Sequence, residues 1–177
     1  MADLAIDIDV FIAILDASAD TAAVHHKTAC VDDLFHVRQT DLPATPVDSW
    51  NTYFRPPLEK DGLVSEADFE SRFVLETSTL DSFIQSNMTS VRIDCPWLHV
   101  VNIESFESKQ VACSTIEHCS GWWRFSRIGY NENRSQALVH TDYDHPKWGL
   151  MGMGHFVLLS HDQSRWRVLA KSMTWIS

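Results

Sequence analysis

The stretch that decides the fold of this chain is GWWRFSRIGYNENRSQALVHTDYDHPKWGLMGMGHFVLLSHDQSRWRVLAKSMTWIS, residues 121–177. Aromatic and aliphatic residues gather there in four runs with the composition of β-strands: WWRFSRIGY, SQALVHTDY, MGHFVLLS and RWRVLAKSMTW. Turn-like residues separate these runs at NEN (131–133), DHPKWG (144–149) and HDQS (161–164). Because such short connections keep sequence neighbours adjacent in space, we predict a four-stranded antiparallel meander sheet.

Upstream of this sheet, the sequence predicts a helix, an extended stretch and a long loop. Apolar residues recur at helical spacing over about residues 3–18, while their alternation with acidic residues leaves a strand at 5–12 as the competing interpretation. Residues 26–37 are typical of an extended segment. Four prolines between residues 39 and 57 exclude regular structure from most of that segment, which predicts a long Pro-rich surface loop.

Capping signatures predict two helix N-termini in the middle of the chain. The capping signature SEAD at 65–68 predicts a helix that runs to about Leu75. Ser78 with Asp81 repeats the signature and predicts a short helix, which Asn87 ends because asparagine tolerates a left-handed cap.

The order of these elements indicates the fold class. Residues 97–103 predict a buried strand and residues 109–118 a further helix. Helices first and a sheet last define an α+β fold, with N-terminal and central helices packed on the C-terminal antiparallel meander. The 177 residues, 45% of them hydrophobic and 21% charged, fit a single globular domain spanning 1–177.

The charge of the chain limits its partners. The formal net charge is −10, and the acidity lies in the first two thirds of the sequence. Phosphate binding needs a concentrated Lys/Arg surface, so we expect neither nucleic acid nor an anionic membrane surface as a partner. A basic protein partner stays open, because an acidic face speeds encounter with one.

The N-terminal residues and the cysteines bear on where in the cell the protein is located. Asp3, Asp7 and Asp9 stand where a secretory signal would be positive, and no apolar run approaches the length of a membrane span. The four cysteines, in a chain large enough to fold without staples, favour reduced thiols, no disulfide and a cytoplasmic location. Cys113 and Cys119 lack the spacing of a zinc knuckle, so no metal or other cofactor is expected.

Several segments together resemble a family of uncharacterised bacterial proteins. They are SRIGYN at 126–131, QALVH at 136–140, GMGHFVLL at 152–159, Trp166 followed by TWIS at 174–177, and, further upstream, TLDSFIQSN at 79–87 and HKTACVDDLF at 26–35. The resemblance covers most of the chain in order, but it implies no activity, because that family has no established function. The insert TDYDHPKWGLM at 141–151 departs from the pattern of the family.

HTDYDH at 140–145 is the densest cluster of potential ligands and acid–base groups. Side chains alternate along a strand, so His140, Asp142 and Asp144 would share one face in steps of about 6.6 Å. Two of them could chelate one ion, whereas three along a flat strand could not, because the end residues lie too far apart. A polar strand end that runs into a loop is the competing interpretation.

Glycines and an arginine are the other candidates for a ligand site. Gly152 and Gly154 lack the context of a phosphate loop, but glycine inside a strand permits close approach of another group. Arg127, on a strand beside aromatic residues, would either anchor an anionic ligand or stack on the rings. A structural use of all three residues is the alternative.

Two hypotheses of function follow from these residues. The first is an acidic binding or interaction domain, which engages an unknown small molecule or protein partner through its acidic helical layer or its aromatic sheet face. The second is a small enzyme of the lyase, isomerase or hydrolase type with a cone-like pocket. In that enzyme His140 or His155 would be the general base, and Asp142 or Asp144 would orient it.

Overall fold

The computed structural model describes residues 4–17, 29–32, 34–35, 54, 74–92, 99–101, 111, 114–115, 119, 121–144, 152–162 and 164–177. Within these ranges the helices are α1 (Leu4–Ala17) and α4 (Thr77–Ser86). The short strands are β1 (Ala29–Asp32), β2 (Leu34–Phe35), β3 (Val91–Arg92), β4 (His99–Val101), β5 (Gly121–Phe125) and β6 (Gly129–Tyr130). The long strands are β7 (Gln136–Asp144), β8 (Gly152–Asp162) and β9 (Arg165–Ile176).

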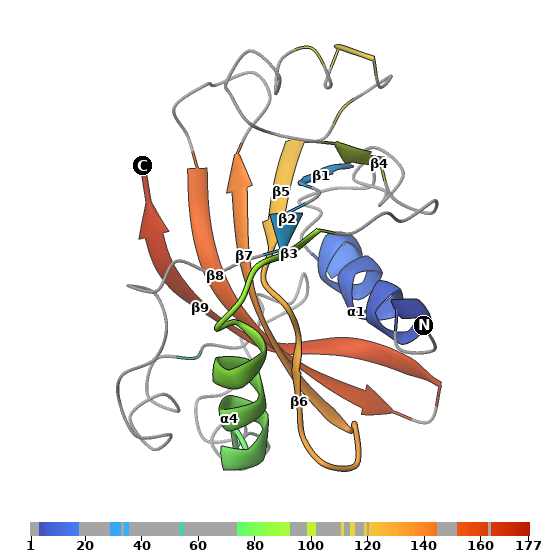
Figure 1. The fold of residues 1–177 in the computed structure, drawn as a ribbon, viewed down its shortest axis with the longest axis vertical. Coiled ribbons are helices and arrows are strands. Elements are labelled where there is room, and N and C mark those ends of the chain that lie inside the picture. Colours follow the sequence, from blue (N-terminus) through green and yellow to red (C-terminus); the bar gives the residue numbers. More distant parts are fainter. Residues whose placement is uncertain are drawn as a thin grey trace, which may run out of the picture.

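The main sheet is mixed rather than purely antiparallel. Its order is β4-β1-β5-β7-β8-β9, and strands β5, β7, β8 and β9 pair antiparallel in that order (Figure 1). The sheet predicted from residues 121–177 did not include β1 and β4. In the structure β1 pairs in parallel with β5 on one side and with β4 on the other. Strands β2 and β3 form a separate antiparallel pair. The α+β class is confirmed, and the sheet is larger than the C-terminal segment alone.

The run WWRFSRIGY is divided between two strands. Both β5 and β6 pair with β7, but Phe125 lies opposite Thr141 whereas Gly129 lies opposite Leu138. The four residue steps from Phe125 to Gly129 therefore lie opposite only three residue steps along β7, from Thr141 to Leu138. This irregularity separates β5 from β6, so the single strand predicted there was wrong.

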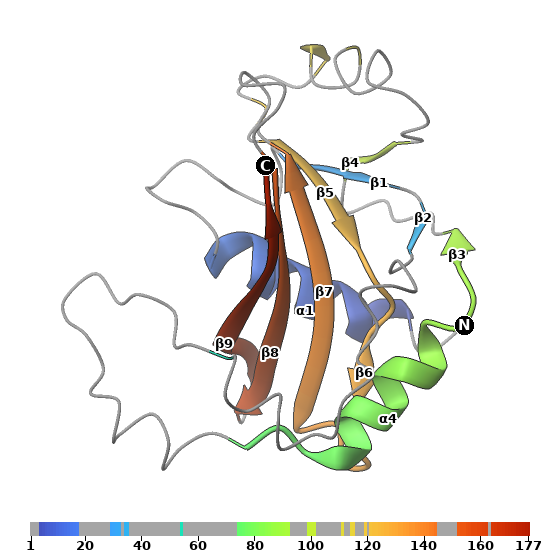
Figure 2. The same ribbon diagram turned by 90° about the vertical axis from the view of Figure 1, so that its left-hand side faces the viewer.

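Two hydrophobic cores lie on the two faces of the sheet, and β7 contributes to both. The α1-side core contains Val10, Phe11, Ile14 and Leu15 of the helix with the alternate β7 residues Ala137 and Val139. The α4-side core contains Leu80 and Phe83 of the helix with Leu138, Phe156 and Leu158. In Figure 2 the long strands β7, β8 and β9 curve side by side, with α1 and α4 at different positions along them. The helix predicted at 3–18 is confirmed as α1.

Helix α4 is fastened to the sheet at its N-terminal end by Gln136. The cap residue Glu76 makes no side-chain cap bond. Instead Gln136 Oε1 accepts from the backbone N–H of Glu76 at 2.8 Å and from the Thr79 hydroxyl at 2.9 Å. Gln136 Nε2 donates to the Val74 carbonyl at 2.9 Å. The short helix expected here is confirmed, but its cap comes from β7 rather than from Ser78.

The other end of α4 is held by Asn87. Its φ of −94° and ψ of 8° are not left-handed, so the predicted cap conformation was wrong. Asn87 Nδ2 donates to the carbonyls of Phe83 and Arg127, and Asn87 Oδ1 accepts from the Arg127 N–H at 2.8 Å. A Cβ on Gly129 would overlap the backbone of Phe83, which shows that the helix lies directly on this glycine.

The other expectations meet the described residues only in part. The extended stretch at 26–37 contains β1 and β2, and the strand at 97–103 contains β4. The helix expected from residue 65 and most of that at 109–118 lie outside the described residues, as does the loop at 39–57 except for Phe54. Phe54 is fully buried in the α4-side core, so at this position the segment does not lie on the surface.

One cysteine contradicts the prediction of four reduced thiols. Cys119 is disulfide-bonded, and its partner is a cysteine whose side chain lies outside the described part of the structure. Disulfides persist in oxidising compartments, so the cytoplasmic location loses one of its two grounds. As for membranes, neither described helix is long and apolar enough to cross one.

Candidate functional site

The three polar residues of β7 point to the α4 side of the sheet. They follow Leu138 at steps of two along one continuous strand, so His140, Asp142 and Asp144 share its face, as alternation predicted. His140 is 2% exposed, while Asp142 and Asp144 are partly buried. The cluster therefore begins in the protein interior and reaches toward solvent at the end of the strand.

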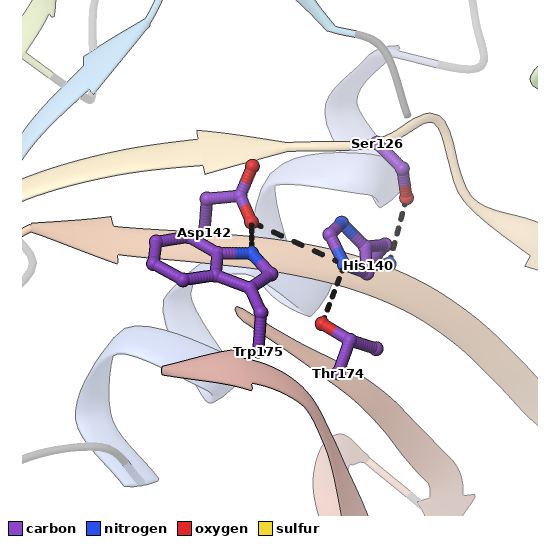
Figure 3. A network of polar contacts seen from close by, with 5 residues as sticks. All are labelled: Ser126, His140, Asp142, Thr174 and Trp175. Carbon is purple, nitrogen blue, oxygen red and sulfur yellow. Dashed lines mark hydrogen bonds and ion pairs between the residues drawn. The ribbon is translucent and has the colours of Figure 1, made fainter. Parts of the chain in front are cut away.

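His140 and Asp142 belong to one network of polar contacts (Figure 3). The indole Nε1 of Trp175 donates to Asp142 Oδ1 at 2.7 Å. His140 Nε2 hydrogen-bonds Thr174 Oγ1 at 3.2 Å and lies 4.0 Å from Asp142 Oδ1. Ser126 Oγ accepts from the backbone N–H of His140 at 2.8 Å. The imidazole is thus held between the Thr174 hydroxyl and the Asp142 carboxylate, and the carboxylate also accepts from Trp175.

A β-bulge in β9 brings two consecutive residues to this network. Gly154 pairs with Trp175 and His155 with Met173, which leaves Thr174 as the extra residue. A Cβ on Gly154 would contact both Trp175 and Thr174, so both side chains lie on the α4 side, where regular alternation would separate them.

The two glycines of β8 make room for Trp175. A Cβ on Gly154 would overlap the indole, and one on Gly152 would come within 2.7 Å of Trp175 Cη2 and 2.5 Å of Asp144 Oδ1. The close approach expected above Gly152 and Gly154 is therefore made by a side chain of the same protein. The surface of β8 at these two glycines, which could have lain under a ligand, lies under the Trp175 side chain instead.

A second buried polar pair lies in the same row of residues, which crosses five strands. Arg124 Nε donates to Asp32 Oδ2 at 2.8 Å, and the Asp32 side chain is only 4% exposed. Arg124 lies opposite Asp142, which lies opposite Gly154. We call these residues the polar row: Asp32, Arg124, Asp142, Gly154 and Trp175.

His155 is on the other face of the sheet from His140. It stands between Gly154 and Phe156, whose side-chain positions face α4, and it lies opposite Thr141. Burial lowers the pKa of His155 to about 4, with the charges of Lys171 and His140 adding to the effect. The two histidines proposed as general bases are therefore neither on one face nor in one network.

Arg127 lies at the end of α4 and not in the His140 network. Its Nη1 donates to the carbonyl of Ser86 at 3.0 Å, and its backbone binds Asn87 in both directions. A guanidinium on the last carbonyls of a helix stabilises the helix end. The contacts of Arg127 thus account for its place without a ligand.

Directly beside the polar row, the opposite face carries apolar side chains. We call these residues the apolar row: Val31, Trp123, Tyr143, Met153 and Ile176. Their exposure rises across the sheet, from 7% at Trp123 to 64% at Ile176. The Trp123 and Tyr143 rings lie 4.7 Å apart between centroids.

Trp123 holds a polar atom that the fold leaves without a partner. Among the buried side-chain N and O atoms of the described ranges, Trp123 Nε1 alone makes no hydrogen bond. Native proteins satisfy nearly all such groups, so an exception points to a bound water or ligand, or to stored strain.

Neither a search for metal ligands nor a comparison with known proteins assigns a function to this site. Across the described ranges, no three His, Cys, Asp or Glu side chains gather as they would around a metal ion. No family model, curated protein or solved structure matches this chain. The resemblance to a bacterial family thus stays a prediction, and functional argument rests on the two rows.

Sequence reasoning missed the residues that complete the network. Thr174 and Trp175 lay within a segment quoted for its resemblance, but no local signal marks a bulge that turns both to one face. Asp32 approaches Arg124 only through parallel pairing of distant strands. Ser126 was visible as a polar residue within the predicted strand WWRFSRIGY, which is too common a pattern to be diagnostic.

Proposed function

We propose that this chain is a binding protein rather than an enzyme. The supporting observation is that Asp142 Oδ1 accepts the Trp175 indole N–H at 2.7 Å while His140 Nε2 bonds Thr174 Oγ1. A general base must reach a proton of the substrate, and here both groups already bind to residues of their own fold. The network therefore fits the role of fixing the end of β9 on the sheet.

The proposed partner is a small molecule or a protein. The net charge of −10 leaves nucleic acid outside the proposal, because nothing in the sequence concentrates basic residues. Helix α1 adds an acidic surface, since Asp9 and Asp16 are exposed and the helix contains no basic residue. A basic protein would be attracted to it.

Acid–base catalysis is the second candidate. It is favoured by the 4.0 Å between His140 Nε2 and Asp142 Oδ1, a pairing that can orient an imidazole and stabilise its charged form. In this alternative, Thr174 would give up its bond to His140 when substrate binds. The cytoplasmic location expected from the sequence is not part of either proposal.

One experiment separates the two functions. The purified chain is screened by thermal shift against a library of small metabolites, and each compound that raises Tm is incubated with stoichiometric protein and followed by NMR. Recovery of an unchanged compound is the result expected for a binding protein. Conversion that is lost in His140→Asn but kept in His161→Asn, which alters an exposed histidine of β8, would overturn the proposal in favour of catalysis.

A further inference from the structure

We infer that the apolar row is a ligand site for a small, mostly apolar molecule with one neutral hydrogen-bond acceptor, such as a ketone, which accepts the indole N–H of Trp123. This inference rests on the proposed function, because it names the site and chemical class of a bound ligand. It concerns the face opposite the His140 network.

The unpaired N–H of Trp123 is the first argument. The side chain is 7% exposed, and its Nε1 has no partner although it is a strong donor. Burial separates this atom from bulk solvent, and no group of the described residues replaces the lost hydrogen bond. A ligand acceptor would restore the bond, and so binding would recover a cost that the free protein bears.

The second argument is a gradient of exposure that leads from the sheet edge toward Trp123, which itself packs in the α1-side core. Tyr143 and Met153 are partly buried, and Ile176 at the sheet edge is 64% exposed. The neighbouring row on this face repeats the gradient from fully buried Phe125 to Met173, which is 56% exposed. Three strand spacings from β5 to β9 span about 14 Å, the length of a bicyclic ring system with a short substituent.

The side chains define the character of the ligand. No residue of the apolar row is charged, and Trp123 and Tyr143 present aromatic rings 4.7 Å apart. Met153 and Met173 add flexible, polarizable walls that adapt to ring systems. One neutral donor cannot offset the cost of burying a carboxylate, whereas it suffices for a carbonyl oxygen.

The test compares two probes that differ in the acceptor alone, 2-acetylnaphthalene and 2-ethylnaphthalene. Each is titrated into the full chain while the indole N–H signals are followed by NMR, with the Trp123 signal identified by its loss in Trp123→Phe. We expect the ketone to bind about tenfold more tightly and to shift the Trp123 signal, since one buried hydrogen bond has about that effect. Equal affinity for the two probes, or no binding of the ketone, would overturn the inference.

Variants at both ends of this gradient guard against loss of folding. Trp123→Phe should lower the affinity for the ketone about tenfold and leave the hydrocarbon unaffected. Met173→Asn, at an exposed position, should weaken both probes several-fold, whereas Met88→Asn, an exposed methionine after α4, should weaken neither. If Trp123→Phe folds and keeps the preference for the ketone, or Met173→Asn binds like the wild type, the site is elsewhere.

The two proposals fail in different ways. Failure of these titrations leaves the binding function intact as long as the screen finds another compound that is recovered unchanged. Conversion of a compound through His140 overturns the binding function, while the ketone preference at Trp123 would stand.

Discussion

The polar row and the apolar row cross the same five strands on opposite faces, one residue apart, and they differ in how their polar atoms are satisfied. In the polar row Asp32 binds Arg124 and Asp142 binds Trp175, each within 2.8 Å. In the apolar row the Trp123 indole has no acceptor, and exposure increases toward the sheet edge. Buried charges can be kept only when they are paired, which makes the polar row a structural element. The face with an unmet donor is the better candidate for recognition.

The pair of Arg124 and Asp32 should give the largest effect on stability. Arg124→Ala leaves a carboxylate whose side chain is 4% exposed without its guanidinium, and we expect a loss of about 3 kcal/mol in the free energy of unfolding. Arg167→Ala is the matched control, because Arg167 Nε also lies 2.8 Å from an aspartate, Asp162, but both side chains are about half exposed. It should cost less than about 1 kcal/mol in urea denaturation. Equal losses would show that burial of Asp32 does not matter.

Gly154→Val tests whether the space above β8 belongs to Trp175. The new side chain would overlap the indole and the Thr174 hydroxyl, so we expect a destabilisation of about 2–3 kcal/mol. His161→Val, at an exposed position of the same strand, should change the free energy of unfolding by less than about 1 kcal/mol. An unchanged Tm in Gly154→Val would mean that Trp175 is not held over this glycine.

Asp142 separates the role of an acceptor from that of a charge. Asp142→Ala leaves the Trp175 N–H without an acceptor and should cost about 1–2 kcal/mol, whereas Asp142→Asn keeps an oxygen and should cost less. Thermal unfolding of the two variants measures the difference. If the asparagine variant loses as much stability as the alanine variant, the negative charge beside His140 is the important property.

His155 should make stability depend on pH in a small but specific way. Its folded pKa is about 4 against 6.5 for an unperturbed histidine, so the unfolded chain binds more protons between these values. Stability from this residue is complete above about pH 6.5 and is lost as the pH falls toward 4. Because the imidazole is partly exposed, we discount the shift to about 1 kcal/mol.

The comparison for this effect is His155→Gln. Denaturation at pH 7 and pH 4.5 should show about 1 kcal/mol less acid destabilisation in this variant than in the wild type. His161→Gln serves as the control and should behave as the wild type. A wild-type pH dependence in His155→Gln would assign the acid sensitivity to other groups.

Much of the fold could be predicted because its signals are local. The spacing of apolar residues predicted α1 and the alternation along β7 predicted which of its side chains share a face. The relative facing of His140 and His155 could not be predicted, because it depends on the register between β7 and β8. The bulge at Thr174 and the parallel strand that carries Asp32 likewise depend on contacts between distant segments. The disulfide of Cys119 was missed for the same reason, since composition does not show which thiols meet.

The cap that Gln136 provides to α4 has a dynamic consequence. A helix of ten residues is marginal by itself in water, and the N-terminal end of α4 has no side-chain cap of its own. Its first turn is completed only when β7 is in place to present the Gln136 amide. We therefore expect α4 and the start of β7 to open as one cooperative unit, with backbone amides in both exchanging with solvent at similar rates. Gln136→Ala should uncouple them, so that the α4 amides exchange well before those of β7.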